Sequence, residues 1–460
     1  MKRLLYVALA AAFAITQVNA QFDQTGESVT LLNYDRLERK VEKSNENIEH
    51  HRRGKRDRTW RKRGELFQDV FAQGIEQVQE GMGPNQLRIF YGEPNNVEKE
   101  TREDGTVVER YVYDHIIYIF TNGTLLAWER KDPIHEDPLK EALRSYKKAM
   151  ELDDRGRVPD KIKPNLEELK LQFKRSGVND YYKENYEKAL EDFKSVLAIN
   201  DMPMFEGVID TLMIQYTGII SREIANQNDS EEMYKQAIKH YKKLAKLGTG
   251  GPNTYLQLKL DYFALGDTTG AIEILKEGYE QYPDSVNIIA NISDTYIVSN
   301  RIEEGLEFIE KVIKRNPDLA QPYYWKGRLL INKEQEEPEE GEELPEETNV
   351  DKAVKAYKKA AELDETLYYV WYDMGYIYYL QGADFYERAS LEEDDKTREK
   401  LNELGKEKYM EAIPMLENAL KFNESNREVK YETLDLLQRM YYKMQMMDEY
   451  NRVKEKKNEL

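Results

Sequence analysis

The residues that decide the fold are 282–317, which read YPDSVNIIANISDTYIVSNRIEEGLEFIEKVIKRNP. Tyr282-Pro283 and Asn316-Pro317 close two successive segments and lie 34 positions apart. The same interval separates other residues of similar size, in the pairs Tyr255/Ile289, Leu258/Ile292, Tyr262/Tyr296, Ala271/Gly305, Leu275/Ile309 and Pro283/Pro317. Two antiparallel helices cross closely where a small residue meets the partner backbone. The spacing therefore predicts a stack of helix pairs.

The register continues on both sides and resembles the tetratricopeptide repeat (TPR), a helix pair of about 34 residues. Units are expected at about 170–203, 204–251, 252–285, 286–319 and 427–460, with two interrupted units between the last two of these. Residues 139–153 match the second half of a further unit. We expect a mainly α fold. A TPR α-α superhelix of about seven repeats fills residues 131–460, with inserts at about 332–350 and 384–408, and a small α+β module precedes it.

Two stretches resemble a family of long exported TPR proteins of Bacteroidetes-type bacteria. They are residues 412–420, AIPMLENAL, and residues 441–450, YYKMQMMDEY. The resemblance implies the architecture and a compartment outside the cytoplasm.

The first twenty residues have the pattern of a signal peptide. Lys2 and Arg3 precede an apolar stretch from Leu4 to Ile15, and Val18-Asn19-Ala20 supplies the small residues of a cleavage site. We expect residues 1–20 to be removed and the mature chain to be periplasmic. The chain has no cysteine, so it can carry neither a lipoprotein anchor nor a disulfide. Association with the outer membrane stays open.

The charge of the chain limits its partners. The formal net charge is −19, and removal of Lys2 and Arg3 with the signal peptide would take it from −19 to −21. A balance this acidic argues against a nucleic-acid partner held over the whole surface.

Residues 81–130 differ from the repeats. Residues 81–94, GMGPNQLRIFYGEP, predict a short helix closed by a Gly-x-Pro turn. Residues 107–113, 116–120 and 124–128 are β-rich, and Asn122-Gly123 is a hairpin signal. The segment resembles the BamE (SmpA-type) module of outer-membrane assembly, although Tyr91 replaces the usual leucine and the lipid-bearing cysteine is absent. The alternative is an unrelated small α+β domain.

Two charge runs stand out. Residues 21–80 are expected to form a helical, basic segment, whose run is Arg52, Arg53, Lys55, Arg56, Arg58, Arg61, Lys62 and Arg63. This run could contact anionic lipid headgroups, an envelope polymer or an acidic partner, or it could be a solvated helix. Residues 334–347 hold nine glutamates and no basic residue, which predicts a loop without a core. Pairing between the two runs is a further alternative.

No pattern of catalysis is present in the sequence. The five histidines are not in metal-ligand spacing, and thiolate metal sites are excluded because cysteine is absent. The S-x-x-K match at Ser145 has no companion motif. We expect neither catalytic residues, nor cofactor, nor metal, and no enzymatic activity.

A second aromatic stripe marks the expected binding groove. In a TPR stack the first helix of each unit lines the concave face. In the sixth unit the core positions hold Trp371, Met374, Gly375 and Tyr378, whereas the groove positions also hold aromatic residues. The predicted partner-binding residues are Tyr324, Trp325, Arg328, Tyr369, Tyr372, Tyr376 and Tyr379. Alternatively, an insert or the superhelix packs over these tyrosines.

The sequence thus predicts a non-enzymatic periplasmic scaffold that binds envelope or exported proteins. A holdase-like carrier of exported polypeptides is the first alternative, and a glycan- or polymer-binding envelope protein is the second.

Overall fold

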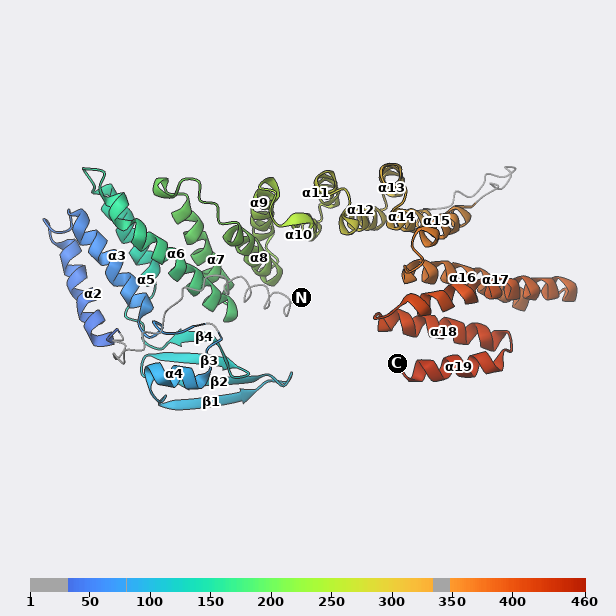
Figure 1. Ribbon diagram of the computed structural model, residues 1–460, viewed down its shortest axis with the longest axis horizontal. Coiled ribbons are helices and arrows are strands. Elements are labelled where there is room, and N and C mark those ends of the chain that lie inside the picture. Colours follow the sequence, from blue (N-terminus) through green and yellow to red (C-terminus); the bar gives the residue numbers. More distant parts are fainter. Residues whose placement is uncertain (1–31, 80, 334–347) are drawn as a thin grey trace. The chain divides into compact units, whose positions relative to one another are not determined.

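A computed structural model describes residues 32–79, 81–333 and 348–460 (Figure 1). The predicted signal peptide at 1–20 and the glutamate run at 334–347 lie outside these residues. The chain forms two compact units, one ending at Ile220 and the other beginning at Ser221. Each unit is built from helices that pack against their neighbours in sequence.

The first unit combines helices with one small sheet. Its elements are α2 (Tyr34–Glu49), α3 (Asp57–Ala72), α4 (Pro84–Tyr91), β1 (Asn96–Thr101), β2 (Val107–Val112), β3 (Ile116–Thr121), β4 (Thr124–Arg130), α5 (Pro138–Glu151), α6 (Val158–Tyr182), α7 (Tyr186–Asn200) and the 3₁₀ turn Pro203–Phe205. Helix α8 (Thr211–Asn228) contains the boundary with the second unit.

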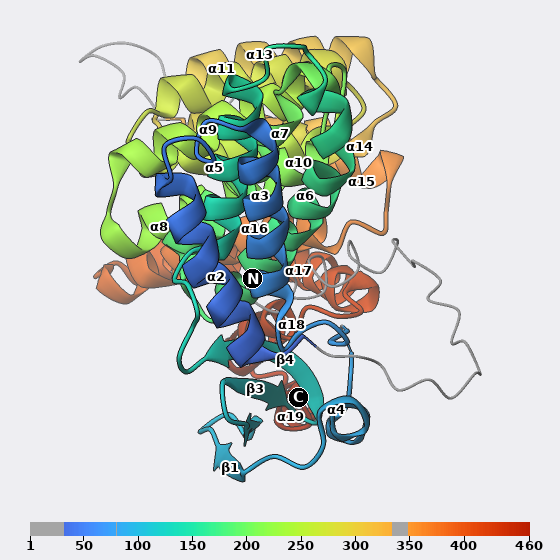
Figure 2. The ribbon, with the colours of Figure 1, turned by 90° about the vertical axis from the view of Figure 1, so that its left-hand side faces the viewer.

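Helix α5, which matches the second half of a repeat, packs against α3 as its first half. Figure 2 shows α2, α3 and α5 side by side. A Cβ added at Gly64 of α3 would lie 2.5 Å from the ring of Tyr146 in α5. Gly177 of α6 meets Phe193 of α7 in the same way. The first helix pair therefore begins before the α+β module, which is inserted between its two helices.

The sheet is an antiparallel meander in the order β1-β2-β3-β4. The hairpin expected at Asn122-Gly123 is confirmed, because Thr121 pairs with Thr124 and both turn residues have positive φ angles of 50° and 78°. The expected helix is also confirmed as α4, which ends at Tyr91 and is capped by Gly92 with a φ of 77°. Strand β1 is the one strand that the sequence analysis does not predict. It is an edge strand, and all six of its residues are exposed.

The sheet is attached to the helices of its own unit. The backbone N–H of Trp128 in β4 donates to Oδ1 of Asn179 in α6 at 2.8 Å. Arg175 of α6 donates to the carbonyl oxygens of Ile75 and Val78, each at 2.8 Å. The first bond satisfies a backbone group of strand β4, and the other two satisfy carbonyl groups of the segment between α3 and α4.

The second unit is helical throughout its described residues. After α8 it contains α9 (Glu231–Lys246), α10 (Gly251–Ala264), α11 (Thr268–Gln281), α12 (Val286–Val298), α13 (Ile302–Arg315), α14 (Ala320–Ile331), α15 (Asn349–Leu363), α16 (Tyr368–Leu391), α17 (Asp395–Phe422), α18 (Arg427–Lys443) and α19 (Met447–Asn458).

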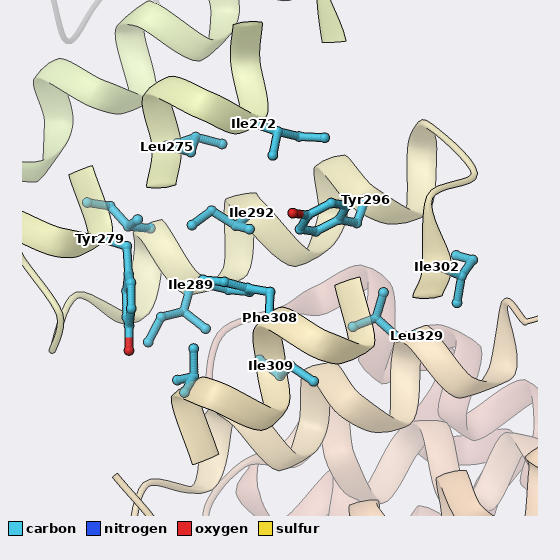
Figure 3. Close-up of a cluster of buried hydrophobic side chains, with 12 residues drawn as sticks. Ile272, Leu275, Tyr279, Ile289, Ile292, Tyr296, Ile302, Phe308, Ile309 and Leu329 are labelled. Atoms are coloured by element: carbon cyan, nitrogen blue, oxygen red, sulfur yellow. The ribbon is translucent and has the colours of Figure 1, made fainter. Parts of the chain in front are cut away.

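The 34-residue period corresponds to one helix pair. Helices α11 and α13 begin at Thr268 and Ile302, which are 34 positions apart. Figure 3 shows their shared core, in which Leu275 of α11, Ile292 of α12 and Ile309 of α13 have no exposed surface. Each pair buries one face against the next pair. The mainly α fold of stacked TPR-type pairs with a small α+β module is therefore confirmed.

Small residues at the helix crossings are fully buried. None has measurable exposed surface: Ala189, Ala237, Ala271, Ala353 and Ala412. Around residues 384–408 the two helices of one pair are simply longer, because α16 has 24 residues and α17 has 28. Gly382 of α16 meets Tyr409 of α17, and Gly405 meets Tyr386, so the lengthened pair keeps the close packing.

Candidate partner-binding site

The candidate site is on α16, a helix with two aromatic faces. Val370, Met374 and Tyr378 are buried in cores shared with α14, α15, α17 and α18. Tyr372 and Tyr376 follow Val370 and Met374 by two positions, and Tyr379 follows Tyr378 by one. These tyrosines point away from the buried face, because successive helical residues are rotated by about 100°. Tyr372 and Tyr379 are therefore half-buried and Tyr376 is 41% exposed.

Tyr372, Tyr376 and Tyr379 form a stack that we call the tyrosine ladder. The ring centroids of Tyr372 and Tyr376 lie 6.1 Å apart with planes 5° from parallel, and those of Tyr376 and Tyr379 lie 6.3 Å apart at 22°. Tyr409 of α17 continues the stack, 5.6 Å from Tyr379. The spacings lie within the range of favourable aromatic pairs. The ladder is thus a preformed row of ring faces and edges.

Helix α18 supplies polar groups to this site. The hydroxyl of Tyr372 donates to Oε2 of Glu432 at 3.0 Å. Burial, and then this carboxylate, raise the pKa of Tyr372 above its ordinary value, so the phenol stays protonated. A hydrogen bond with Tyr379 and the charge of Asp435 raise the pKa of Arg439. Carboxylates and a guanidinium therefore flank the exposed rings.

Trp325 and Arg328 on α14 lie at the N-terminal end of α16. The ring of Tyr369 is 4.6 Å from that of Tyr324, and Trp325 packs against the same core cluster. Arg328 approaches Asp373 to 4.0 Å. Burial raises the pKa of Asp373. The structure thus places Trp325, Arg328 and Tyr369 together, next to the tyrosine ladder.

Tyr324 is a correction to the predicted partner-binding set. It is only 8% exposed and packs against Tyr357 and Tyr369 inside a core cluster. Its position on α14 faces α15 and α16 rather than solvent. Its hydroxyl accepts from Nη1 of Arg328 at 3.3 Å. Tyr324 therefore supports the site from behind and offers no surface to a partner.

The alternative that other segments cover the tyrosines holds for part of the set. Tyr409, from the lengthened part of the α16–α17 pair, covers one face of Tyr379. Glu432 holds the hydroxyl of Tyr372. Tyr376 keeps the largest exposed fraction of the ladder. No sequence pattern indicates Tyr409, Glu432 or Arg439. The rule that first helices line the groove points to α18 but does not select its residues.

The basic run also needs a correction. Arg63 is 6% exposed, and its Nε lies 2.7 Å from Oε1 of Glu141 in α5. Its Nη1 donates to Ser44 and Asn45 of the α2 helix. Arg63 is therefore an internal ion-pair residue and not a surface contact. Arg61 is half-buried, and the remaining residues are exposed: Arg52, Arg53, Lys55, Arg56, Arg58 and Lys62.

No group of three or more histidine, aspartate or glutamate side chains in the described ranges is arranged to hold a metal ion. Among the same residues, no helix combines the length and apolar character needed to cross a bilayer.

Residues 262–329 match the family model of the tetratricopeptide repeat. This range covers α11, α12 and α13, with parts of α10 and α14, and the pairs on either side repeat the same packing. The match identifies this part of the chain as tetratricopeptide repeats, which generally mediate protein–protein interactions. A search of curated proteins found no match.

Solved structures similar to this chain are also TPR proteins. A TPR repeats protein from Bacteroides fragilis is 17% identical, with 58% of this chain and 97% of that chain covered and a TM-score of 0.30. The C-terminal part of a TPR repeat-containing protein from Cytophaga hutchinsonii is 15% identical, with 65% and 96% covered and a TM-score of 0.34. Yeast Tom70 is 17% identical, with 71% and 56% covered and a TM-score of 0.35. Because these TM-scores are low, the identification of the repeats rests on the family match and the helix packing.

Proposed function

We propose that this protein is a non-enzymatic adaptor of the cell envelope, which binds an extended segment of a partner protein along the tyrosine ladder. The observation that carries the proposal is the ladder itself. Three tyrosines are stacked on one helix face, and Tyr376 stays 41% exposed at the centre. Aromatic residues held rigidly at a surface are typical anchors of protein interfaces.

The polar groups beside the ladder suit a polypeptide. Glu432, Asp435 and Arg439 offer acceptors and donors to backbone amides and carbonyls. The ring faces offer contacts to apolar side chains at the same time. Capture of an extended segment by alternating aromatic and polar contacts is a recurring mode of peptide recognition.

The compartment is part of the proposal and rests on the sequence. The pattern of residues 1–20 supports export to the periplasm, without a lipid anchor because no cysteine is present. The resemblance to exported Bacteroidetes-type TPR proteins favours the same location. The resemblance of residues 81–130 to BamE-type modules favours partners in envelope assembly.

The test is a double substitution, Tyr372→Ala with Tyr376→Ala, in the full-length chain. Partners are crosslinked in intact cells and quantified by mass spectrometry, and the thermal unfolding of each variant is measured. Two aromatic anchors that each cost about 2 kcal/mol on truncation weaken a micromolar complex by roughly a thousandfold. Tyr442→Ala is the matched control, because Tyr442 is 65% exposed on α18 and outside the ladder.

The proposal predicts that one or a few stoichiometric partners disappear in the double variant and remain in the control. The midpoint of unfolding falls modestly, because Tyr372 also packs against the core and bonds to Glu432, but the variant stays folded at the temperature of the crosslinking. An early unfolding transition with unchanged partners would show that the ladder is structural. A heterogeneous set of unfolded clients would favour a carrier instead, and recovery of envelope polymer would favour a glycan-binding protein.

A further inference from the structure

The first unit contains a cavity between the end of β4, the start of α5, and helices α6 and α7. Its volume is about 270 Å³, close to the lower end of typical small-ligand sites. Ser176, Asp180, Asp192 and Trp128 form part of its wall. Lys140 and Lys188 are half exposed at its rim. This cavity is separate from the tyrosine ladder, which belongs to the second unit.

Asp192 of α7 is the unusual group in this wall. It is only 3% exposed, and its Oδ2 has no hydrogen-bond partner among the described residues. A buried carboxylate oxygen without a partner loses its hydration and gains nothing in return, which costs several kcal/mol when the group is charged. A cationic ligand would offset this cost.

The groups around the cavity compensate the charge of Asp192 only in part. The carboxylates of the wall are Glu129, Asp132, Glu136, Asp137, Asp180 and Asp192. The cations of the wall already have partners. Arg130 donates to the carbonyl oxygens of Phe71 and Gln73, and Lys183 approaches Asp180 to 3.5 Å. Lys140 pairs with Glu191 and Asp137, and Lys188 lies 3.9 Å from Asp137.

We propose that this cavity binds a small organic ammonium group, with Asp192 as its counter-charge. The excess of carboxylates in the wall excludes an anion. A divalent metal ion would need several oxygen or nitrogen ligands, and the described residues offer no such group here. An ammonium group needs one carboxylate and tolerates aromatic neighbours, which here include Trp128 and the stacked rings of Tyr34 and His115.

The ionisation of Asp192 makes the binding depend on pH. Burial, together with the charge of Asp180, raises the pKa of Asp192 to about 7, although Ser176, Lys188 and Lys140 lower it. A cation binds the ionised form, so the affinity increases as pH rises through 7. The other charged or titratable groups that line the cavity include Glu129 and Arg130 of β4, Asp132, His135, Glu136 and Asp137 before α5, Asp180 and Lys183 of α6, and His115.

An ammonium group can belong to a free amine or to a lysine side chain of a peptide, and the probes distinguish these two ligands. Isothermal titration calorimetry on the full-length chain uses four probes. They are n-butylammonium chloride, a short peptide with an acetylated N-terminus and a free lysine side chain, potassium chloride and sodium butyrate. We expect saturable binding of at least one ammonium probe and none of butyrate. A preference for n-butylammonium identifies a free amine, and a preference for the peptide identifies a side chain.

Asp192→Asn is expected to weaken binding of the ammonium probe at least tenfold, and Asp201→Asn is the matched control. Asp201 is an exposed aspartate at the end of the same helix. In the unmodified chain the affinity should be about tenfold higher at pH 8 than at pH 6, since the ionised fraction changes by that factor around a pKa of about 7. The comparison between pH 8 and pH 6 uses the unmodified chain, so it does not depend on whether a variant folds. The absence of saturable ammonium binding, equal binding by Asp192→Asn, or an affinity independent of pH would each overturn the proposal, as would equal binding of potassium.

Discussion

The insertion of the α+β module into a helix pair makes a specific prediction about Gly64. In an exposed helix interior, Gly→Ala stabilises a protein by about 1 kcal/mol, because alanine has the higher helix propensity. In α3, however, the new methyl carbon would lie 2.5 Å from two ring carbons of Tyr146. Gly64→Ala therefore tests whether α3 and α5 pack as the two helices of one repeat.

The magnitude follows from how firmly Tyr146 is held. Its side chain has no exposed surface, and its hydroxyl donates to Oε1 of Gln68 at 2.5 Å. The ring cannot move without breaking this bond, so the methyl group overpacks the crossing at a cost of up to about 3 kcal/mol. With about 1 kcal/mol returned by propensity, the net loss is about 2 kcal/mol. For a unit of this size that lowers the unfolding midpoint by roughly 4–8 °C.

The assay combines thermal unfolding followed by circular dichroism with amide hydrogen exchange, which assigns the loss to α3 and α5. Glu65→Ala is the matched control, since Glu65 is the exposed neighbour of Gly64 on the same helix. The control should leave the midpoint within about 2 °C. If Gly64→Ala raised the midpoint instead, as at an open helical site, α3 would not be the partner of α5, and the inserted-module description would fail.

Three other changes are expected to have measurable effects. Ala271→Leu overpacks a crossing with no exposed surface and should cost about 1–3 kcal/mol in chemical denaturation. Arg63→Ala leaves the buried Glu141 with only the exposed Arg144, at 3.4 Å, as a counter-ion and should cost about 3 kcal/mol, whereas the exposed Lys62→Ala should stay within about 0.5 kcal/mol. The Asp192 carboxyl keeps its proton up to about pH 7 when folded but ionises near pH 4 when unfolded. The folded chain thus holds the extra proton between these values, so its stability falls as pH rises through them; Asp192→Asn should remove this component in unfolding measured at pH 5 and pH 8.

The repeats were predictable because their signal is local and recurs. Each crossing needs a small residue and a large residue at fixed positions, so Ala271 and Leu275 have counterparts one period later in Gly305 and Ile309. The β1 strand gave no such signal. Its residues, NVEKET, are all exposed, so no alternation of apolar and polar side chains marks it.

The candidate site was predictable only on one helix. The spacing of Tyr372, Tyr376 and Tyr379 places them on one face, as the 3.6-residue period requires, and the structure shows them stacked. Their polar neighbour Glu432 lies sixty positions away, and no periodicity within α16 can select it. The burial of Tyr324 depends likewise on Tyr369 of a later helix. Contacts between repeats depend on the packing of two helices, and a pattern within one helix carries no information about them.

The places where the repeats are interrupted follow from the same packing. The α+β module lies between α3 and α5, residues 332–348 lie between α14 and α15, and the extra residues near 384–408 lengthen α16 and α17. Each interruption thus falls between the two helices of one pair. Added chain at such a turn costs only a slowly growing loop entropy, and Gly64–Tyr146, Gly327–Tyr357 and Gly375–Leu416 still make the close contacts of their crossings. An insertion within a helix would instead rotate its buried face away from the neighbouring pair, because each added residue turns the helix by about 100°. The chain can therefore acquire a whole α+β module or a longer aromatic hairpin without losing the core between successive pairs.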